Sequence, residues 1–162
     1  AINSEWVPVE SWAEVLGKDL DTPDELGNLA HADFIASPDN LKYSEKLRTL
    51  FIGEDSGLHV NNFLWAYNVD TKELTRILST PSGAESTGLH AVDEVNGFTY
   101  VMSNFQHAGD WELKKDKDGK ITGGVHAKVY ETLDPLIKQN YADAHGKMGA
   151  SVGYLTGIPS QV

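Results

Sequence analysis

Three polar clusters in this sequence carry side chains that bind cations or transfer protons. The first runs from Gly53 to Gly57 and is followed by further polar side chains, His59, Asn61 and Asn62. It contains two adjacent carboxylates, Glu54 and Asp55, and hard cations such as Ca²⁺ prefer carboxylate and carboxamide oxygens. The cluster therefore fits either a cation site or a solvated acidic turn.

The second cluster, Pro81–Gly88, holds one carboxylate, Glu85, between two glycines. A carboxylate in a short polar loop is suited to contact a metal ion or a charged substrate group, and an ordinary turn is the alternative. Ser86 is not the nucleophile of a hydrolase elbow, because that motif requires a glycine two residues before the serine.

The third cluster, Asn104–Trp111, contains His107. An imidazole at such a position can bind a metal ion, act as a general acid or donate a hydrogen bond to a phosphoryl oxygen. A structural or simply exposed histidine is the alternative, since the sequence has six histidines.

Several well-known site motifs are missing from the sequence. There is no EF-hand loop, no His-Glu-x-x-His pair, no phosphate-binding Gly-Lys-Ser/Thr loop and no Gly-x-Gly-x-x-Gly run. The pattern Asp116-x-Asp118-Gly119 resembles half of a calcium loop, but a hairpin tip is the better interpretation because the remaining ligands are absent.

Composition excludes several classes of function. The 162 residues include 24 Asp and Glu against 13 Lys and Arg, a net charge of −11, which disfavours nucleic acid and anionic membranes as partners. The sequence has no cysteine, so it offers no disulfide, thiolate zinc site or cysteine nucleophile. Its longest apolar run, Phe63–Tyr67, is too short to span a bilayer. The N-terminal residues do not form a signal peptide, which we expect to be absent or removed.

The elements that must position these clusters are mostly strands. Aromatic and β-branched residues predict strands over 47–52, 62–69 and 74–78. Asn96-Gly97 predicts a tight hairpin between strands 88–95 and 98–103, because both residues accept a positive φ. Asp118-Gly119 predicts a weaker hairpin between residues 111–113 and 120–122.

The two ends of the chain differ from this β-like region, residues 32–125. Residues 1–31 form an irregular lead-in, anchored by Trp6 and Trp12, that we expect to pack against another part. Helical turns are expected at 11–16, capped by Ser11, and a helix start at 22–25. In the last segment, residues 126–162, apolar spacing predicts a helix over 129–144 with Pro135 within or near its first turn. The glycine-rich tail 148–158 is then a loop or a closely packed strand.

A faint internal repeat of about 50 residues connects segments 37–54 and 92–104. Each unit has a polar turn, an apolar strand and a polar cluster at the end of that strand. Repeats of this length with several short strands are typical of propeller blades, whereas chance similarity is the alternative. We therefore expect a mainly β fold, part of a β-propeller of about two to three blades, with a C-terminal helical segment.

Five segments, taken in order, resemble the C-terminal part of the PhoX-type alkaline phosphatases. The resemblance runs over roughly residues 32–111, and the closing segment 152–159 also looks like the end of such a chain. The segments are Ala36–Leu41, Leu50–Asp55, Asn61-Asn62, Gly83–Gly88 and Asn104–Asp110.

This resemblance implies a six-bladed β-propeller that is exported to the periplasm or the extracellular space and hydrolyses phosphomonoesters with iron and calcium ions. Carried over residue by residue, the metal ligands would be Glu54, Asp55 and Glu85, with Asn61 and Asn62 as further contributors. His107 would be the candidate catalytic residue. Cations held by carboxylates would stabilise the charge that develops during phosphoryl transfer.

The chain departs from that family in length and in lacking a cysteine that contributes to the iron site. We therefore expect iron to need ligands outside this chain, the remaining blades to come from the parent protein or another chain, and the isolated chain to be nearly inactive. Two alternatives stay open. One is a non-catalytic interaction module supported by calcium, and the other is a calcium-dependent lactonase or esterase on a similar propeller.

Overall fold

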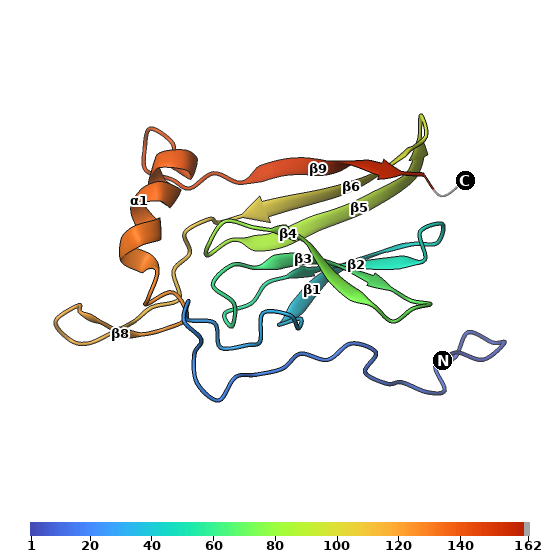
Figure 1. The fold of residues 1–162 in the computed structure, drawn as a ribbon, viewed down its shortest axis with the longest axis horizontal. Coiled ribbons are helices and arrows are strands. Elements are labelled where there is room, and N and C mark those ends of the chain that lie inside the picture. Colours follow the sequence, from blue (N-terminus) through green and yellow to red (C-terminus); the bar gives the residue numbers. More distant parts are fainter. Residues whose placement is uncertain (161–162) are drawn as a thin grey trace.

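A computed structural model describes residues 1–160 and consists mainly of two antiparallel sheets, one above the other in Figure 1. The first sheet has the order β1-β2-β3-β4, and the second has the order β5-β6-β9. The strands of the first sheet are β1 (Pro38–Ser44), β2 (Thr49–Glu54), β3 (Phe63–Asn68) and β4 (Leu74–Ser79). Those of the second are β5 (Glu85–Val95), β6 (Phe98–Gln106) and β9 (Ser151–Pro159).

The first sheet is buried on both faces because its central strands are apolar at successive positions. Phe51 and Leu64 point into the core shared with the second sheet, where they pack with Val101. Their neighbours Ile52 and Trp65 point to the other face and form a second core. This alternation is the period of two that a strand imposes on its side chains, and it confirms the prediction of a mainly β fold.

The second sheet is built on the predicted Asn96-Gly97 hairpin. Both turn residues have positive φ values, 53° and 83°, as a two-residue hairpin turn requires. The sheet approaches the first one closely at Gly53, where a Cβ atom would lie 2.3 Å from the carbonyl oxygen of Ser86. Any larger residue at position 53 would therefore push apart the two segments that carry Asp55 and Glu85.

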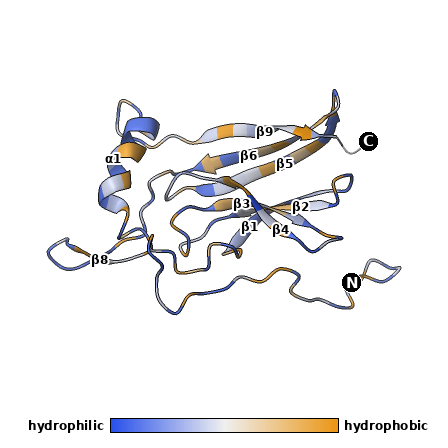
Figure 2. Ribbon diagram, viewed as in Figure 1, coloured by the Kyte–Doolittle hydropathy of each residue, from blue (hydrophilic) through white to orange (hydrophobic). Residues whose placement is uncertain are grey.

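The single helix among residues 1–160 is α1 (Tyr130–Tyr141), which lies inside the predicted range. Pro135 lies early in the second turn, next to the first, in agreement with the prediction of a position within or near the first turn. Figure 2 shows hydrophilic and hydrophobic segments alternating along α1. Its buried residue Ile137 packs against Ala84 and Ala108, which are the neighbours of Glu85 and His107 in the sequence. The helix thus supports two loops of the candidate site.

The predicted weak hairpin is present as β7 (Lys114–Lys115) and β8 (Ile121–Gly123), with its strands shifted by a few residues. The tail forms strand β9, but this strand is largely exposed, with Val152 and Tyr154 at 73% and 62% exposure. It pairs with β6 along one edge of the second sheet.

The lead-in contains isolated bridges but no helix, so both predicted helical turns are wrong. Asp24 accounts for one of them, because its Oδ1 accepts hydrogen bonds from the backbone N–H groups of Leu26, Gly27 and Asn28 and closes a local turn. The expected anchors Trp6 and Trp12 are 81% and 62% exposed.

The internal repeat does not match element by element. Residues 38–40 begin strand β1, whereas residues 92–94 end strand β5. Only the outline is common to both units, since β2 and β6 each end in one of the polar clusters. No helix in the described residues is long and apolar enough to cross a membrane.

Candidate metal centre

Three side chains from the three polar clusters meet at one end of the two sheets. Asp55 follows β2, Glu85 begins β5 and His107 follows β6, and one ligand atom of each lies within 4.8 Å of the others. Glu85 was expected in a loop but is the first residue of a strand. Two carboxylates and one imidazole are a donor set suited to a divalent cation.

Glu85 is the most firmly held member of this cluster. Its carboxylate is buried, accepts hydrogen bonds from Gln106 and from Asn40 Nδ2 at 3.3 Å, and lies 3.4 Å from His107 Nε2. Burial favours the neutral acid, but hydrogen bonds from Gln106, His107 and Thr87 outweigh it and lower the pKa of Glu85. Glu85 is therefore an ionised, pre-positioned oxygen donor.

Asp55 has the opposite electrostatic environment. Partial desolvation and the nearby negative charge of Glu85 raise the pKa of Asp55 above its usual value. No side-chain hydrogen bond or ion pair to Asp55 is present among residues 1–160 that would relieve this repulsion. A cation between the two carboxylates would relieve it.

His107 is oriented by the loop that precedes Glu85. Its Nδ1 lies 3.1 Å from the carbonyl oxygen of Gly83, so this nitrogen carries the proton and donates it. The backbone of His107 has a positive φ of 44°, which is uncommon for a residue with a side chain. When Nδ1 carries a proton, a lone pair on Nε2 would repel the Glu85 carboxylate. The contact is favourable only if Nε2 is protonated as well or if a cation is bound between the two groups.

Glu54, predicted as a ligand, lies in the core next to this cluster rather than in it. It is fully buried, and its two oxygens accept four hydrogen bonds. The donors are Ala36 N, Trp65 Nε1, Phe63 N and His59 Nδ1, at 2.7–3.1 Å. With four donors on two oxygens, Glu54 organises the first sheet and its flanking segments.

Asn61 and Asn62, the other predicted oxygen donors, bind neighbouring loops. Asn61 donates to the carbonyl of Thr80 and accepts from Ser82. Asn62 accepts from the backbone N–H of Ser56 and donates to the carbonyl of Ala84. Their side-chain oxygens therefore hold the loops that carry Asp55 and Glu85, and the structure does not bring them into the cluster.

A small polar cavity of about 60 Å³ lies beside the cluster. Asp55 and His107 line it together with four titratable residues that were not predicted as site residues: His59, Asp110, Glu112 and His126. His59 stands in the first polar cluster and Asp110 in the third, so their proximity in sequence was the signal that could have found them. Nothing in the sequence pattern points to His126.

His126 is a buried neutral histidine. Its Nδ1 accepts a hydrogen bond from the backbone N–H of Glu112, and its Nε2 donates to the carbonyl of Val60 at 3.0 Å. Burial is the main reason why the pKa of His126 is lowered. Protonation would place a second proton on Nδ1 and break the bond to Glu112.

We expect this histidine to make the fold less stable in mild acid. Below the ordinary histidine pKa of 6.5, His126 of the unfolded chain binds a proton, whereas His126 of the folded chain does not. The free energy of unfolding therefore decreases as the pH is lowered. Urea unfolding in chelator at pH 7.5 and 5.5 should show a loss of about 1 kcal/mol that is absent in His126→Gln. The exposed His145→Gln should keep the loss, and an equal pH effect in His126→Gln would contradict this assignment.

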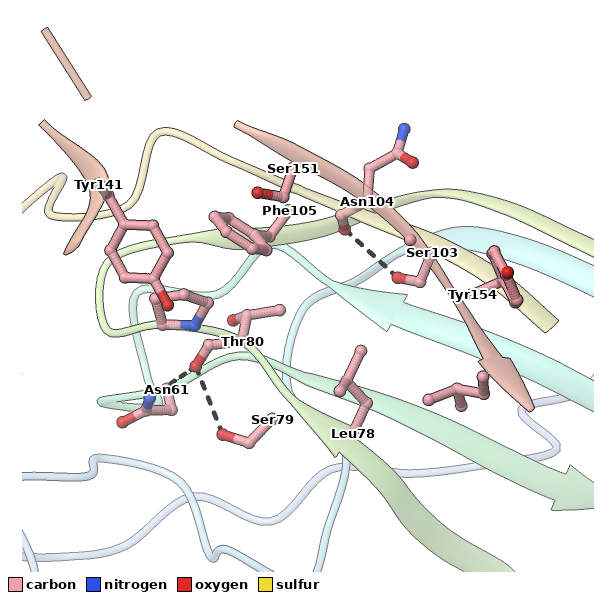
Figure 3. A pocket seen from close by; sticks show the side chains of 13 residues that line it. Asn61, Leu78, Ser79, Thr80, Ser103, Asn104, Phe105, Tyr141, Ser151 and Tyr154 are labelled. Carbon is pink, nitrogen blue, oxygen red and sulfur yellow. Dashed lines mark hydrogen bonds between the residues drawn. The ribbon is translucent and has the colours of Figure 1, made fainter. Parts of the chain in front are cut away.

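A second and larger cleft of about 560 Å³ lies between β4 and β9 (Figure 3). Figure 3 shows Leu78 and Thr80 on one side and Phe105 and Tyr154 on the other. The residues that line this cleft include no acidic, basic or histidine side chain. This cleft therefore offers no charged or imidazole group for cation or proton chemistry.

Comparison with known proteins found no match among protein-family models, curated proteins or solved structures. The resemblance of residues 32–111 to PhoX-type phosphatases thus stays a prediction.

Proposed function

We propose that this chain forms part of a metal-dependent phosphomonoesterase in which Asp55, Glu85 and His107 hold a divalent cation. The observation that carries the proposal is the convergence of these three side chains within 4.8 Å from separate segments of the chain. The order of the five family-like segments supports the phosphatase assignment, and it also supports a location outside the cytoplasm.

The donor set fits a cation for two reasons. Asp55 and Glu85 repel each other, and His107 Nε2 faces the Glu85 carboxylate at 3.4 Å. A nitrogen donor beside two carboxylates suits a first-row transition ion such as iron, whereas calcium would need more oxygen ligands than these two residues supply. Calcium therefore requires oxygen ligands in addition to those of Asp55 and Glu85. Since the sequence has no cysteine, iron would be bound without a thiolate from this chain.

The residues of this chain would have distinct tasks in the reaction. A bound cation supplies Lewis-acid stabilisation of the phosphoryl oxygens. Gln106 holds Glu85, and the carbonyl of Gly83 fixes which nitrogen of His107 is available. His107 is 42% exposed at its side chain, so it is accessible to a phosphoryl group arriving from solvent.

The two sheets are proposed to be neighbouring propeller blades. The first is a four-stranded meander with the order β1-β2-β3-β4, which is the architecture of a blade, and its strand β1 contacts β5 of the second sheet through Asn40 and Glu85. Further blades would supply the missing ligands. An experimental structure of the protein in its complete assembly tests this arrangement, which requires further four-stranded units around a common axis.

The test of function combines cation binding by this chain with turnover by the longer protein that we propose it belongs to. Mn²⁺ titration calorimetry should show a site whose affinity falls about tenfold in Glu85→Gln and is unchanged in the exposed control Glu94→Gln. The longer protein should hydrolyse 4-nitrophenyl phosphate and lose that activity with chelator.

Three results would contradict the proposal in different ways. Binding that is equal in Glu85→Gln would remove the cluster as a cation site. Cleavage of 4-nitrophenyl acetate without cleavage of the phosphate ester would favour the esterase alternative. Cation binding with neither activity in the longer protein would favour a non-catalytic module.

A further inference from the structure

We propose that the small polar cavity beside the cluster binds a divalent cation of its own, with His59 Nε2 and Asp55 as ligands and Glu54 as the residue that orients His59. The proposal rests on the proposed function only in using Asp55 as a cation ligand. It gives roles to two residues, His59 and Glu54, that the cluster does not include.

The first observation is an imidazole nitrogen without a partner. His59 is 1% exposed, and its Nε2 is buried with no hydrogen-bond partner among the described residues. Its Nδ1 lies 3.1 Å from Glu54 Oε2. Because a carboxylate oxygen only accepts, Nδ1 carries the proton and Nε2 keeps a free lone pair.

His59 lines the cavity, whereas Glu54, which its Nδ1 contacts, does not. Because Nδ1 faces Glu54, we infer that the opposite edge of the ring, with the buried Nε2, lies on the cavity side. Phe63 packs against the imidazole at a centroid distance of 5.3 Å and restricts its rotation. A buried polar atom without a partner destabilises a fold, so a lone pair kept in this place needs a ligand.

The second observation is uncompensated charge around the same space. Asp55, Asp110 and Glu112 line the cavity, and their carboxylates have no hydrogen bond or ion pair among residues 1–160. The nearby imidazole of His126 is occupied at both nitrogens and provides no positive charge. Three carboxylates and one free imidazole nitrogen together favour a cation over an anion.

The size of the cavity limits what can bind. About 60 Å³ has room for an ion with about one water, given about 30 Å³ for each water, and excludes a substrate molecule. The pair formed by Glu54 and His59 is the arrangement by which a carboxylate orients a metal-binding histidine. His107 is oriented in a related way, since its Nδ1 donates to a carbonyl and its Nε2 faces the Glu85 carboxylate.

The test follows the imidazole nitrogens directly during Zn²⁺ titration of ¹⁵N-labelled chain. Long-range ¹H–¹⁵N spectra should show His59 with a protonated Nδ1 and an unprotonated Nε2, and Zn²⁺ should shift the Nε2 resonance. His126 is an internal control that should not shift, because both of its nitrogens are bound. Zn²⁺ affinity at this position should fall at least tenfold in His59→Gln and stay unchanged in His90→Gln.

The outcomes separate this proposal from the proposed function. A shift at His107 with none at His59 would overturn the cavity site and leave the cluster intact. A shift at neither histidine would overturn both, and a His59 that is protonated at Nε2 in the absence of metal would overturn the cavity site alone. If His59→Gln does not fold, the resonance can be assigned in the wild-type chain from its contact with the ring of Phe63.

Discussion

Replacement of Glu54 by glutamine is expected to lower the free energy of unfolding by about 3–5 kcal/mol, the range for breaking a buried network of charged hydrogen bonds. The carboxylate accepts from two backbone N–H groups, the Trp65 indole and the His59 imidazole. Glutamine replaces one of the two accepting oxygens by an NH₂ group. This group donates hydrogen bonds and cannot accept them from the donors that the oxygen contacted. Two donors would then be buried without a partner.

Chemical unfolding of wild type, Glu54→Gln and Glu94→Gln measures this effect. Glu94 is exposed and accepts a hydrogen bond from the backbone N–H of Gly97, so its replacement should leave the unfolding free energy nearly unchanged. Failure of Glu54→Gln to fold while Glu94→Gln folds would agree with the prediction. Equal stability of the two variants would show that Glu54 does not organise the core.

Replacement of Asp55 by asparagine is expected to weaken cation binding about 100-fold while slightly stabilising the cation-free fold. Partial desolvation and the charge of Glu85 raise the pKa of Asp55, so at pH 7 ionised Asp55 opposes folding. Removing this charge should add a few tenths of a kcal/mol, a small gain because Asp55 is exposed. The gain should disappear well below pH 3.8, where Asp55 is protonated in both states.

Thermal unfolding with and without Mn²⁺ separates the two effects. At a cation concentration of about 100 times the wild-type Kd, the wild type should gain about 2.7 kcal/mol and Asp55→Asn only about 0.4 kcal/mol. Asp21→Asn, at an exposed position away from the cluster, should keep the full gain. The prediction would be contradicted if Asp55→Asn were less stable than wild type without Mn²⁺ and gained as much stability as wild type when Mn²⁺ is added.

Local signals predicted those parts of the fold that depend on neighbours in the sequence. Asn96-Gly97 specifies its hairpin because the backbone of a tight turn needs positive φ at those two positions. The apolar spacing that includes Ile137 predicts α1, because one face of the helix is buried. The region around Ser11 has a capping residue and apolar residues at helical spacing, but the pattern covers little more than one turn and Trp12 and Leu16 are exposed, so a short helix there has no packing to stabilise it.

The site could be predicted in part for the same reason. Asp55, Glu85 and His107 stand out as polar residues at the ends of strands, but their convergence depends on the packing of β1 against β5, which no local pattern shows. Glu54 and Asp55 look equivalent in the sequence. They face opposite environments because side chains alternate along the chain, so that one enters the core and the other the cluster.

The position of β9 in the chain has a consequence for biosynthesis. Strand β6 carries His107 at its end and pairs with β5 on one side and β9 on the other, yet segment 107–150 separates it from β9. As the chain leaves the ribosome, the β5–β6 hairpin is therefore complete while the outer edge of β6 still exposes unpaired N–H and C=O groups. During that interval this edge is a template for pairing with another nascent chain, and synthesis of residues 151–159 closes it.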